Sequence, residues 1–170
     1  MVHALVQQQR FARSEFRRGL EGLTGEEARF RPLKADGSRM NCISWAVGHL
    51  ANQEALFFLR GTGAGTVDER LRPFLSGQPA CEPELGEVLE LWQQTSAKVD
   101  AFLETADGEA LQGSLQISWP ENLGTALMRS TFHYWFHCGE VNAIRQLLGH
   151  PEIIYVGQMI GALEYPPSPT

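Results

Sequence analysis

The sequence predicts an all-α fold, in which residues 1–170 form a single four-helix bundle domain with long connections between the helices. Apolar residues recur at three- and four-residue steps in four separate stretches, and no convincing strand lies between them. The length of 170 residues suits one domain with a sizeable core. Because the connections are too long for a minimal up-and-down bundle, we expect crossovers between some neighbouring helices.

The first half of the chain contains two of these helices. Residues 2–21 form the first one, because apolar residues recur there at helical spacing. A loop at 24–40 follows, in which the capping-box pattern at Thr24 predicts one short helical turn. Asn41 is the predicted N-cap of the second helix, which ends at Gly61.

The second half contains the other two helices and a tail. A connection rich in Gly and Pro at 61–83 leads to the third helix, at 84–106. An irregular connection at 107–120 precedes the fourth helix, at about 121–148. The tail, at about 151–170, carries apolar residues and is expected to pack on the body before its last residues fray.

The composition argues against several classes of protein. The net charge is −6 and 43% of the residues are hydrophobic, as in an ordinary globular protein. No apolar run reaches the length of about 18 residues that a membrane-spanning helix needs, so we expect no membrane partner. The N-terminal segment turns polar too early for a signal peptide, and a cytoplasmic location is therefore predicted.

The basic residues and the cysteines do not indicate a binding function. Four arginines at helical spacing predict a solvated face and no nucleic-acid partner, because backbone binding needs a stronger basic surface; they are Arg10, Arg13, Arg17 and Arg18. Three widely spaced cysteines make neither a disulfide framework nor a zinc motif, and suit a reducing compartment; they are Cys42, Cys81 and Cys138.

Three histidines form the candidate metal site. His133 and His137 are four residues apart on the fourth helix, so their imidazoles lie on one face, one turn from each other. Four apolar residues share or border that face and predict that it points inward, where unpartnered imidazoles would be costly; they are Met128, Phe136, Ile144 and Leu148. His49 on the second helix supplies a third ligand if the two helices face each other.

The chemistry of such a site follows from its ligands. Three neutral imidazoles suit zinc, nickel, copper or ferrous iron rather than calcium or magnesium. Three protein ligands leave a position for water or substrate, which is typical of catalytic rather than structural zinc sites. Tyr134 stands where an HExxH metalloprotease has glutamate, so that class is excluded. The alternative is that the histidines are satisfied core residues.

Five further residues are candidates for roles around these histidines. Glu140, three residues after His137, either orients a ligand imidazole or acts as a catalytic general base, unless it pairs with Arg145. Four residues are candidates for lining the pocket, with ordinary packing or hydrogen bonding as the alternative; they are Trp45, Asn52, Gln53 and Tyr134.

Two segments resemble the DinB-like (YfiT-like) family of metalloenzymes, namely SWAVGHLANQE and HYWFHCGEVNAIRQLLGHP. That family takes one histidine from its second helix and an HxxxH pair from a later helix, which match His49, His133 and His137. The resemblance covers most of the chain. It implies a four-helix bundle of the DinB/YfiT-like type with an unusual connection order, often homodimeric, which holds zinc or nickel. Some relatives transfer low-molecular-weight thiols such as bacillithiol, mycothiol or glutathione, and some are thiol-dependent isomerases.

The leading hypothesis is a metal-dependent enzyme of this family. A divalent metal, with zinc or nickel expected, would activate a thiol or water for transfer to, or hydrolysis of, a small electrophilic substrate. The expected partners are that substrate, a low-molecular-weight thiol as cosubstrate and a second copy of the chain. Two alternatives remain open: a non-catalytic metal-binding stress-response protein, and a helical interaction module whose histidines are only polar core residues.

Overall fold

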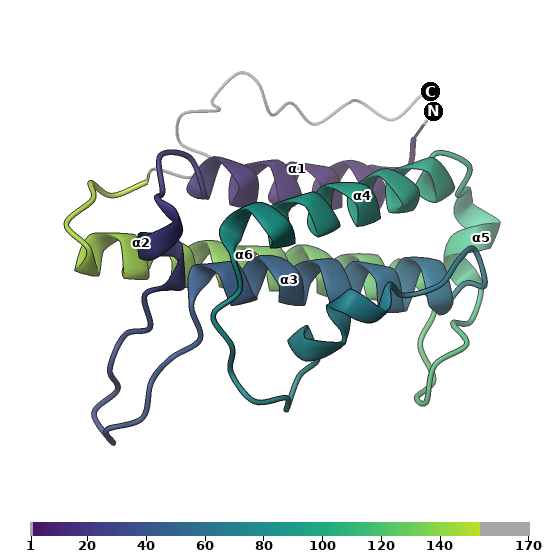
Figure 1. Cartoon of the computed structure of the whole chain (residues 1–170). Coiled ribbons are helices and arrows are strands. Elements are labelled where there is room, and N and C mark those ends of the chain that lie inside the picture. The colour runs from purple at the N-terminus through teal and green to yellow at the C-terminus, as the bar shows by residue number, and fades with distance from the viewer. Residues whose placement is uncertain (1, 154–170) are drawn as a thin grey trace.

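The computed structural model describes residues 2–153 (Figure 1). Four long helices make up most of it: α1 (Ala4–Gly19), α3 (Ile43–Glu54), α4 (Leu85–Leu103) and α6 (Leu123–Leu147). Four short elements complete it: the α-helices α2 (Gly25–Arg29) and α5 (Gly108–Gln112), the π-helix η1 (Ala55–Arg60) and the 3-10 helix η2 (Glu69–Phe74). Over the described residues the only β-structure is two isolated bridges, so the all-α prediction is confirmed.

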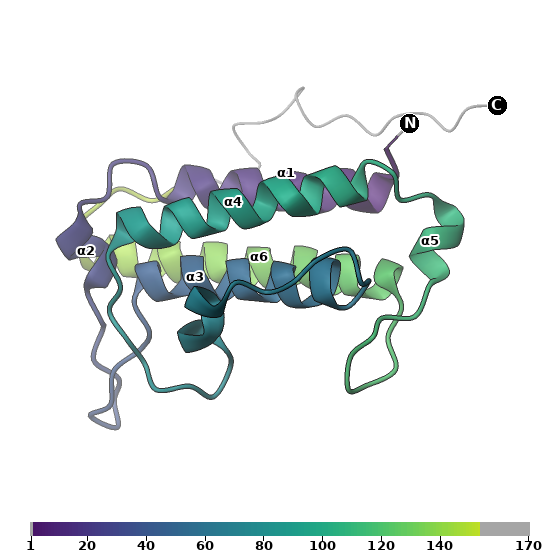
Figure 2. The same ribbon diagram turned by 45° about the vertical axis from the view of Figure 1, so that its right-hand side comes forward.

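The four long helices lie in two layers, with α1 and α4 in one and α3 and α6 in the other (Figures 1 and 2). α1 and α6 run in one direction, whereas α3 and α4 run in the opposite one (Figure 1). Because α3 and α4 are parallel, the chain between them must return along the bundle. This return is the expected crossover, and it lays η2 against α3. The arrangement is compatible with a four-helix bundle that has long connections.

A buried polar network joins the four long helices inside the apolar core. The carboxylate of Glu54 accepts hydrogen bonds from Gln9 at 2.6 Å, from Arg13 at 2.9 Å and from Tyr134 at 2.8 Å. Arg13 also pairs with Asp100 of α4 at 2.7 Å. The prediction of a solvated face is wrong for Arg13, which is only 6% exposed. Helical spacing placed it among other arginines but did not reveal its acidic partners on two other helices.

Local signals explain most of the boundaries. The capping box is confirmed, because Thr24 accepts from the Glu27 amide and the Glu27 side chain accepts from the Thr24 amide. The prediction of Asn41 as an N-cap is one residue early: Cys42 caps α3, and its Sγ accepts from the Trp45 amide at 3.4 Å. The second predicted helix changes to the π-helix η1 at its end, and the two connections after it contain η2 and α5.

Three further predictions concern the tail, membrane spans and the cysteines. Almost all of the tail lies beyond the described residues, so its packing stays a prediction. None of the described helices combines the length and the apolar character needed to cross a membrane. No disulfide links the three cysteines, of which Cys42 and Cys138 are buried.

Candidate metal site and its cavity

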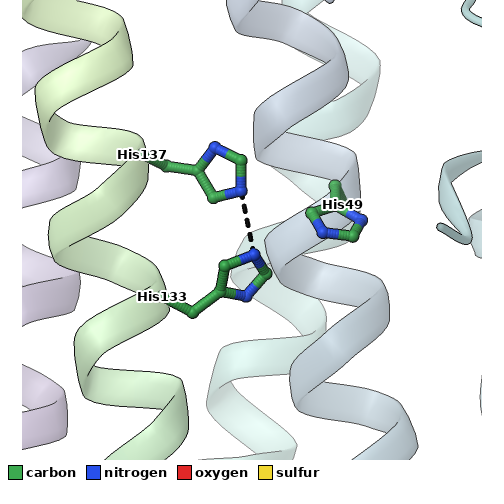
Figure 3. A group of neighbouring side chains, drawn as sticks. All are labelled: His49, His133 and His137. Carbon is green, nitrogen blue, oxygen red and sulfur yellow. Dashed lines mark hydrogen bonds between the residues drawn. The ribbon is translucent and has the colours of Figure 1, made fainter.

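The three predicted histidines meet between α3 and α6 (Figure 3). One ring nitrogen from each lies within 4.8 Å of the other two, and the Nε2 atoms of His133 and His137 are 3.0 Å apart. Nitrogens that share a tetrahedral zinc at about 2.05 Å are roughly 3.3 Å apart. The spacing of this group therefore fits a single transition-metal ion, and His49, His133 and His137 are the residues that would hold it.

Hydrogen bonds to groups outside the cluster orient two of the three imidazoles, while His133 is hydrogen-bonded, among the described residues, only to His137 (Figure 3). The Nδ1 of His49 donates to the carbonyl oxygen of Phe74 at 2.8 Å, and the Nδ1 of His137 donates to the carboxylate of Glu140 at 2.6 Å. A proton on Nδ1 leaves Nε2 as the atom with a free lone pair. Such outer partners are typical of metal-ligating histidines, because they fix both the tautomer and the ring plane. Glu140 thus occupies the place of an orienting carboxylate.

The position of the Phe74 carbonyl depends on a glycine. A Cβ at Gly48 would lie 2.6 Å from Cγ of the Phe74 ring, a distance that real Cβ atoms essentially never show. The missing side chain lets η2 pack directly against α3 beside His49. The indole of Trp45 stacks on the imidazole of His49, with 4.6 Å between the ring centroids. Trp45 therefore supports a ligand ring, and its indole Nε1 is buried without a hydrogen-bond partner among the described residues.

Burial keeps His49 and His133 uncharged. It lowers the pKa of His49, and the neighbouring His137 lowers it further. The pKa of His133 falls to about 3, because of burial first and then because of His137, His49 and the guanidinium of Arg129. Both imidazoles are therefore neutral at neutral pH, which is the form that binds a metal.

A cavity of about 430 Å³ opens beside the histidines. His49 and His133 form part of its wall, and six other residues complete it: Gln53, Phe57, Ser76, Arg129, Ser130 and Phe132. This volume lies in the range of small-molecule sites in proteins. The group of ring nitrogens is therefore next to a space that a small substrate can occupy.

The four candidate pocket residues lie in different places. Gln53 lines this cavity, whereas Asn52 lines a separate one of about 230 Å³ and donates to the Leu71 carbonyl oxygen at 3.1 Å. Trp45 stacks on His49, as described above. Tyr134 is fully buried in the polar network and receives a hydrogen bond from Trp92 at 2.8 Å.

The face of α6 that carries the histidines does not point wholly inward. Met128 is 47% exposed and Phe136 is 61% exposed, so the expectation that these two mark an inward face is wrong. Ile144 is buried and Leu148 is half-buried, as that expectation required. The core side of the helix lies around Tyr134, and His137 is buried whereas His133 is half-buried. The pair therefore lies at the border between core and surface, where a substrate can approach it.

Sequence reasoning missed several residues of this site. Phe74 contributes a backbone carbonyl, which no side-chain pattern reveals. Arg129 lies four residues before His133, one helical turn away, so the same spacing that joined the histidines indicated it. Phe57 and Ser76 come from other elements, and only the crossover brings Ser76 to the cavity.

Comparison with known proteins identifies the family. The sequence profile of the DinB superfamily matches residues 8–150. A comparison with curated proteins gives no match. One similar solved structure is the crystal structure of a conserved protein from Enterococcus faecalis, with a TM-score of 0.64 and 14% identity over 88% of this chain and 99% of that chain. At this identity the likeness shows the fold alone. Because the profile spans most of the sequence, the chain belongs to the DinB superfamily.

Proposed function

We propose that this protein is a metal-dependent enzyme, in which a thiol or water attacks a small electrophile held in the 430 Å³ cavity. His49, His133 and His137 would hold a divalent transition metal, with zinc or nickel expected. The observation that carries the proposal is the convergence of three imidazoles, two of them held by hydrogen bonds, at the wall of a cavity of substrate size.

The donor set supports a transition metal rather than calcium or magnesium. All three donors are imidazole nitrogens, which suit zinc, nickel, copper or ferrous iron, whereas the hard cations prefer oxygen. Three protein ligands leave at least one position for an exchangeable group, as in catalytic sites. A metal bound there would lower the pKa of a coordinated water or thiol, so that a nucleophile is available near neutral pH.

The residues around the ligands have separate tasks in this proposal. The Phe74 carbonyl and the Glu140 carboxylate hold two imidazoles in the correct tautomer, so Glu140 is a positioning residue. Gln53 and Ser130 line the cavity and offer hydrogen bonds to a substrate. No basic residue other than Arg129 and the two histidines lines the cavity within the described part of the chain.

The thiol, if one reacts, would come from solution. None of the described cysteines lines the cavity. Burial raises the pKa of Cys138 to about 12, and Cys42 is buried at the N-cap of α3. Because a thiolate and not a thiol is the nucleophile, neither is suited to attack. This supports a low-molecular-weight thiol as cosubstrate.

Turnover tests the enzymatic proposal. Protein loaded with zinc or nickel would be assayed with panels of low-molecular-weight thiols and of electrophiles such as epoxides and chloro-compounds. We expect conjugation or hydrolysis that depends on the metal and disappears in the His133→Ala, His137→Ala double variant. Activity that survives in this variant refutes the proposed role, whereas metal binding without any turnover would favour a non-catalytic metal-binding protein.

The homodimer also stays a prediction. Light scattering during size-exclusion chromatography would measure the molar mass in solution and so distinguish a dimer from a monomer.

A further inference from the structure

The cavity beside the histidines contains one arginine whose guanidinium is held in place on two sides. Nε and Nη2 of Arg129 bind the two carboxylate oxygens of Glu121, at 2.8 and 2.6 Å. Cζ of Arg129 lies over the ring of Phe57, 4.3 Å from the ring centroid. Arg129 is therefore presented to the cavity in one fixed orientation, although it belongs to a long and flexible residue type.

The arrangement leaves the far edge of the guanidinium available. The side chain of Glu121 is only 5% exposed, and its oxygens already accept from Arg129 and from Trp119 Nε1 at 2.9 Å. Arg129 is 45% exposed, and among the described residues no partner binds its Nη1. The Glu121 side chain is thus largely covered, whereas Arg129 is partly exposed, lines the cavity and keeps unused N–H donors on Nη1 and Nη2. That edge has the geometry that binds a second carboxylate through two hydrogen bonds.

The rest of the cavity wall suits an anion. None of its lining residues is acidic, although the whole chain has a net charge of −6. Gln53, Ser76 and Ser130 add neutral hydrogen-bonding groups. Arg129 and His133 are separated by four residues on α6, which is about 6 Å along the helix axis. A small molecule can therefore reach both at once.

We propose that Arg129 binds the carboxylate of a small molecule whose other end reaches the three histidines, so that the cavity selects carboxylate-bearing ligands. This inference rests on the proposed function for its second contact, the metal. The Glu121–Arg129 pair acts as a preformed receptor for the carboxylate, and the histidine group receives the reacting end. Arg129 is then a specificity-determining residue rather than part of the metal site.

Binding of simple thiols to the cobalt-loaded protein tests this inference without any turnover. The probes are 3-mercaptopropionate, 4-mercaptobutyrate and 6-mercaptohexanoate, each compared with the mercaptoalcohol of the same chain length. Thiolate coordination to Co²⁺ gives a charge-transfer band in the near ultraviolet, which measures each dissociation constant. For at least one chain length we expect the carboxylate to bind about tenfold or more tightly than its alcohol, the gain typical of a charge-assisted hydrogen bond.

Variants assign that preference to the guanidinium. Arg129→Gln should remove the preference and leave mercaptoalcohol binding unchanged, and Arg129→Lys should keep only part of it. Because Arg129→Gln leaves the covered Glu121 carboxylate without its cationic partner, with only the hydrogen bond from Trp119, the double variant Glu121→Gln, Arg129→Gln provides a neutral pair at these two positions. Equal binding of acids and alcohols to the cobalt-loaded wild type, or a preference that persists in Arg129→Gln and in the double variant, refutes the inference while leaving the metal site intact. Failure to bind Co²⁺ at all would instead refute the proposed function.

Discussion

The contact between Gly48 and Phe74 makes the substitution Gly48→Ala a sharp test of how the site is built. The new Cβ would lie 2.6 to 2.8 Å from three atoms of the Phe74 ring. To reach an ordinary contact of 3.4 Å, the ring must withdraw by roughly 0.8 Å. These atoms are close to the backbone of η2 and the ring is buried, so the segment must move with it. The hydrogen bond from His49 to the Phe74 carbonyl would then lengthen from 2.8 Å beyond a useful distance.

Two opposing effects set the magnitude. Overpacking of a core contact costs about 1–3 kcal/mol, whereas replacing glycine by alanine within a helix stabilises by about 1 kcal/mol. We therefore expect a net loss of up to about 2 kcal/mol in the free energy of unfolding. Loss of an outer hydrogen bond to a ligating histidine typically weakens metal affinity by about 10- to 100-fold. Urea denaturation of the metal-free protein and competition with a chromophoric zinc chelator measure the two effects.

A second glycine provides the matched control. Gly139 lies in α6, two residues after His137, and a Cβ there would meet nothing within 4 Å. Gly139→Ala should therefore stabilise the protein by up to about 1 kcal/mol and leave zinc affinity unchanged. If Gly48→Ala behaves like this control, the crossover does not hold His49 in the way described.

Three further predictions concern the side chains around and below the site. Glu140→Gln should weaken zinc binding by about tenfold, because an amide is a poorer acceptor for the His137 Nδ1 proton. The control Glu87→Gln, on the exposed side of α4, should leave the zinc affinity unchanged. Isothermal titration calorimetry measures both affinities. Folding lowers the pKa values of His49 and His133 below the ordinary 6.5, so protons bind more tightly to the unfolded chain than to the folded one. The free energy of unfolding of the metal-free protein should therefore be highest above pH 6.5 and should fall as the pH drops toward about 3. Melting temperatures at pH 7 and 5.5 test this, and an unchanged slope in His133→Asn would contradict it. Glu54→Leu should cost about 3–5 kcal/mol in chemical denaturation, since the buried guanidinium beside it loses its main partner; a loss below 1 kcal/mol would mean that the network contributes little.

Much of the fold is predictable because it depends on local patterns. Each long helix carries apolar residues at helical spacing, and the capping box at Thr24 is a purely local signal. The histidine pair is also local, since His133 and His137 need only one regular helix to meet. His49 lies far away in the chain, so its place on a second long helix made it only a candidate ligand, and the resemblance to the DinB-like family strengthened the prediction that it joins them.

The features that escaped prediction depend on contacts between distant segments. Arg13 is one of several arginines at helical spacing, and only packing of the helices brings Glu54 to it. The Phe74 carbonyl has no side-chain signature, and its place follows from the crossover and from Gly48. The inward direction predicted from Met128 and Phe136 is wrong because both are exposed, and apolar character alone does not tell an inward residue from an exposed one.

The amount and affinity of bound metal test the central claim most directly. The protein would be purified without a histidine tag, stripped with a chelator and titrated with Zn²⁺ and Ni²⁺, with metal content measured by mass spectrometry and melting temperature by calorimetry. We predict one ion per chain, a rise in melting temperature on binding, and loss of both effects in single alanine variants of His49, His133 and His137. Protein that holds no metal and whose melting temperature does not respond to either ion would contradict the account.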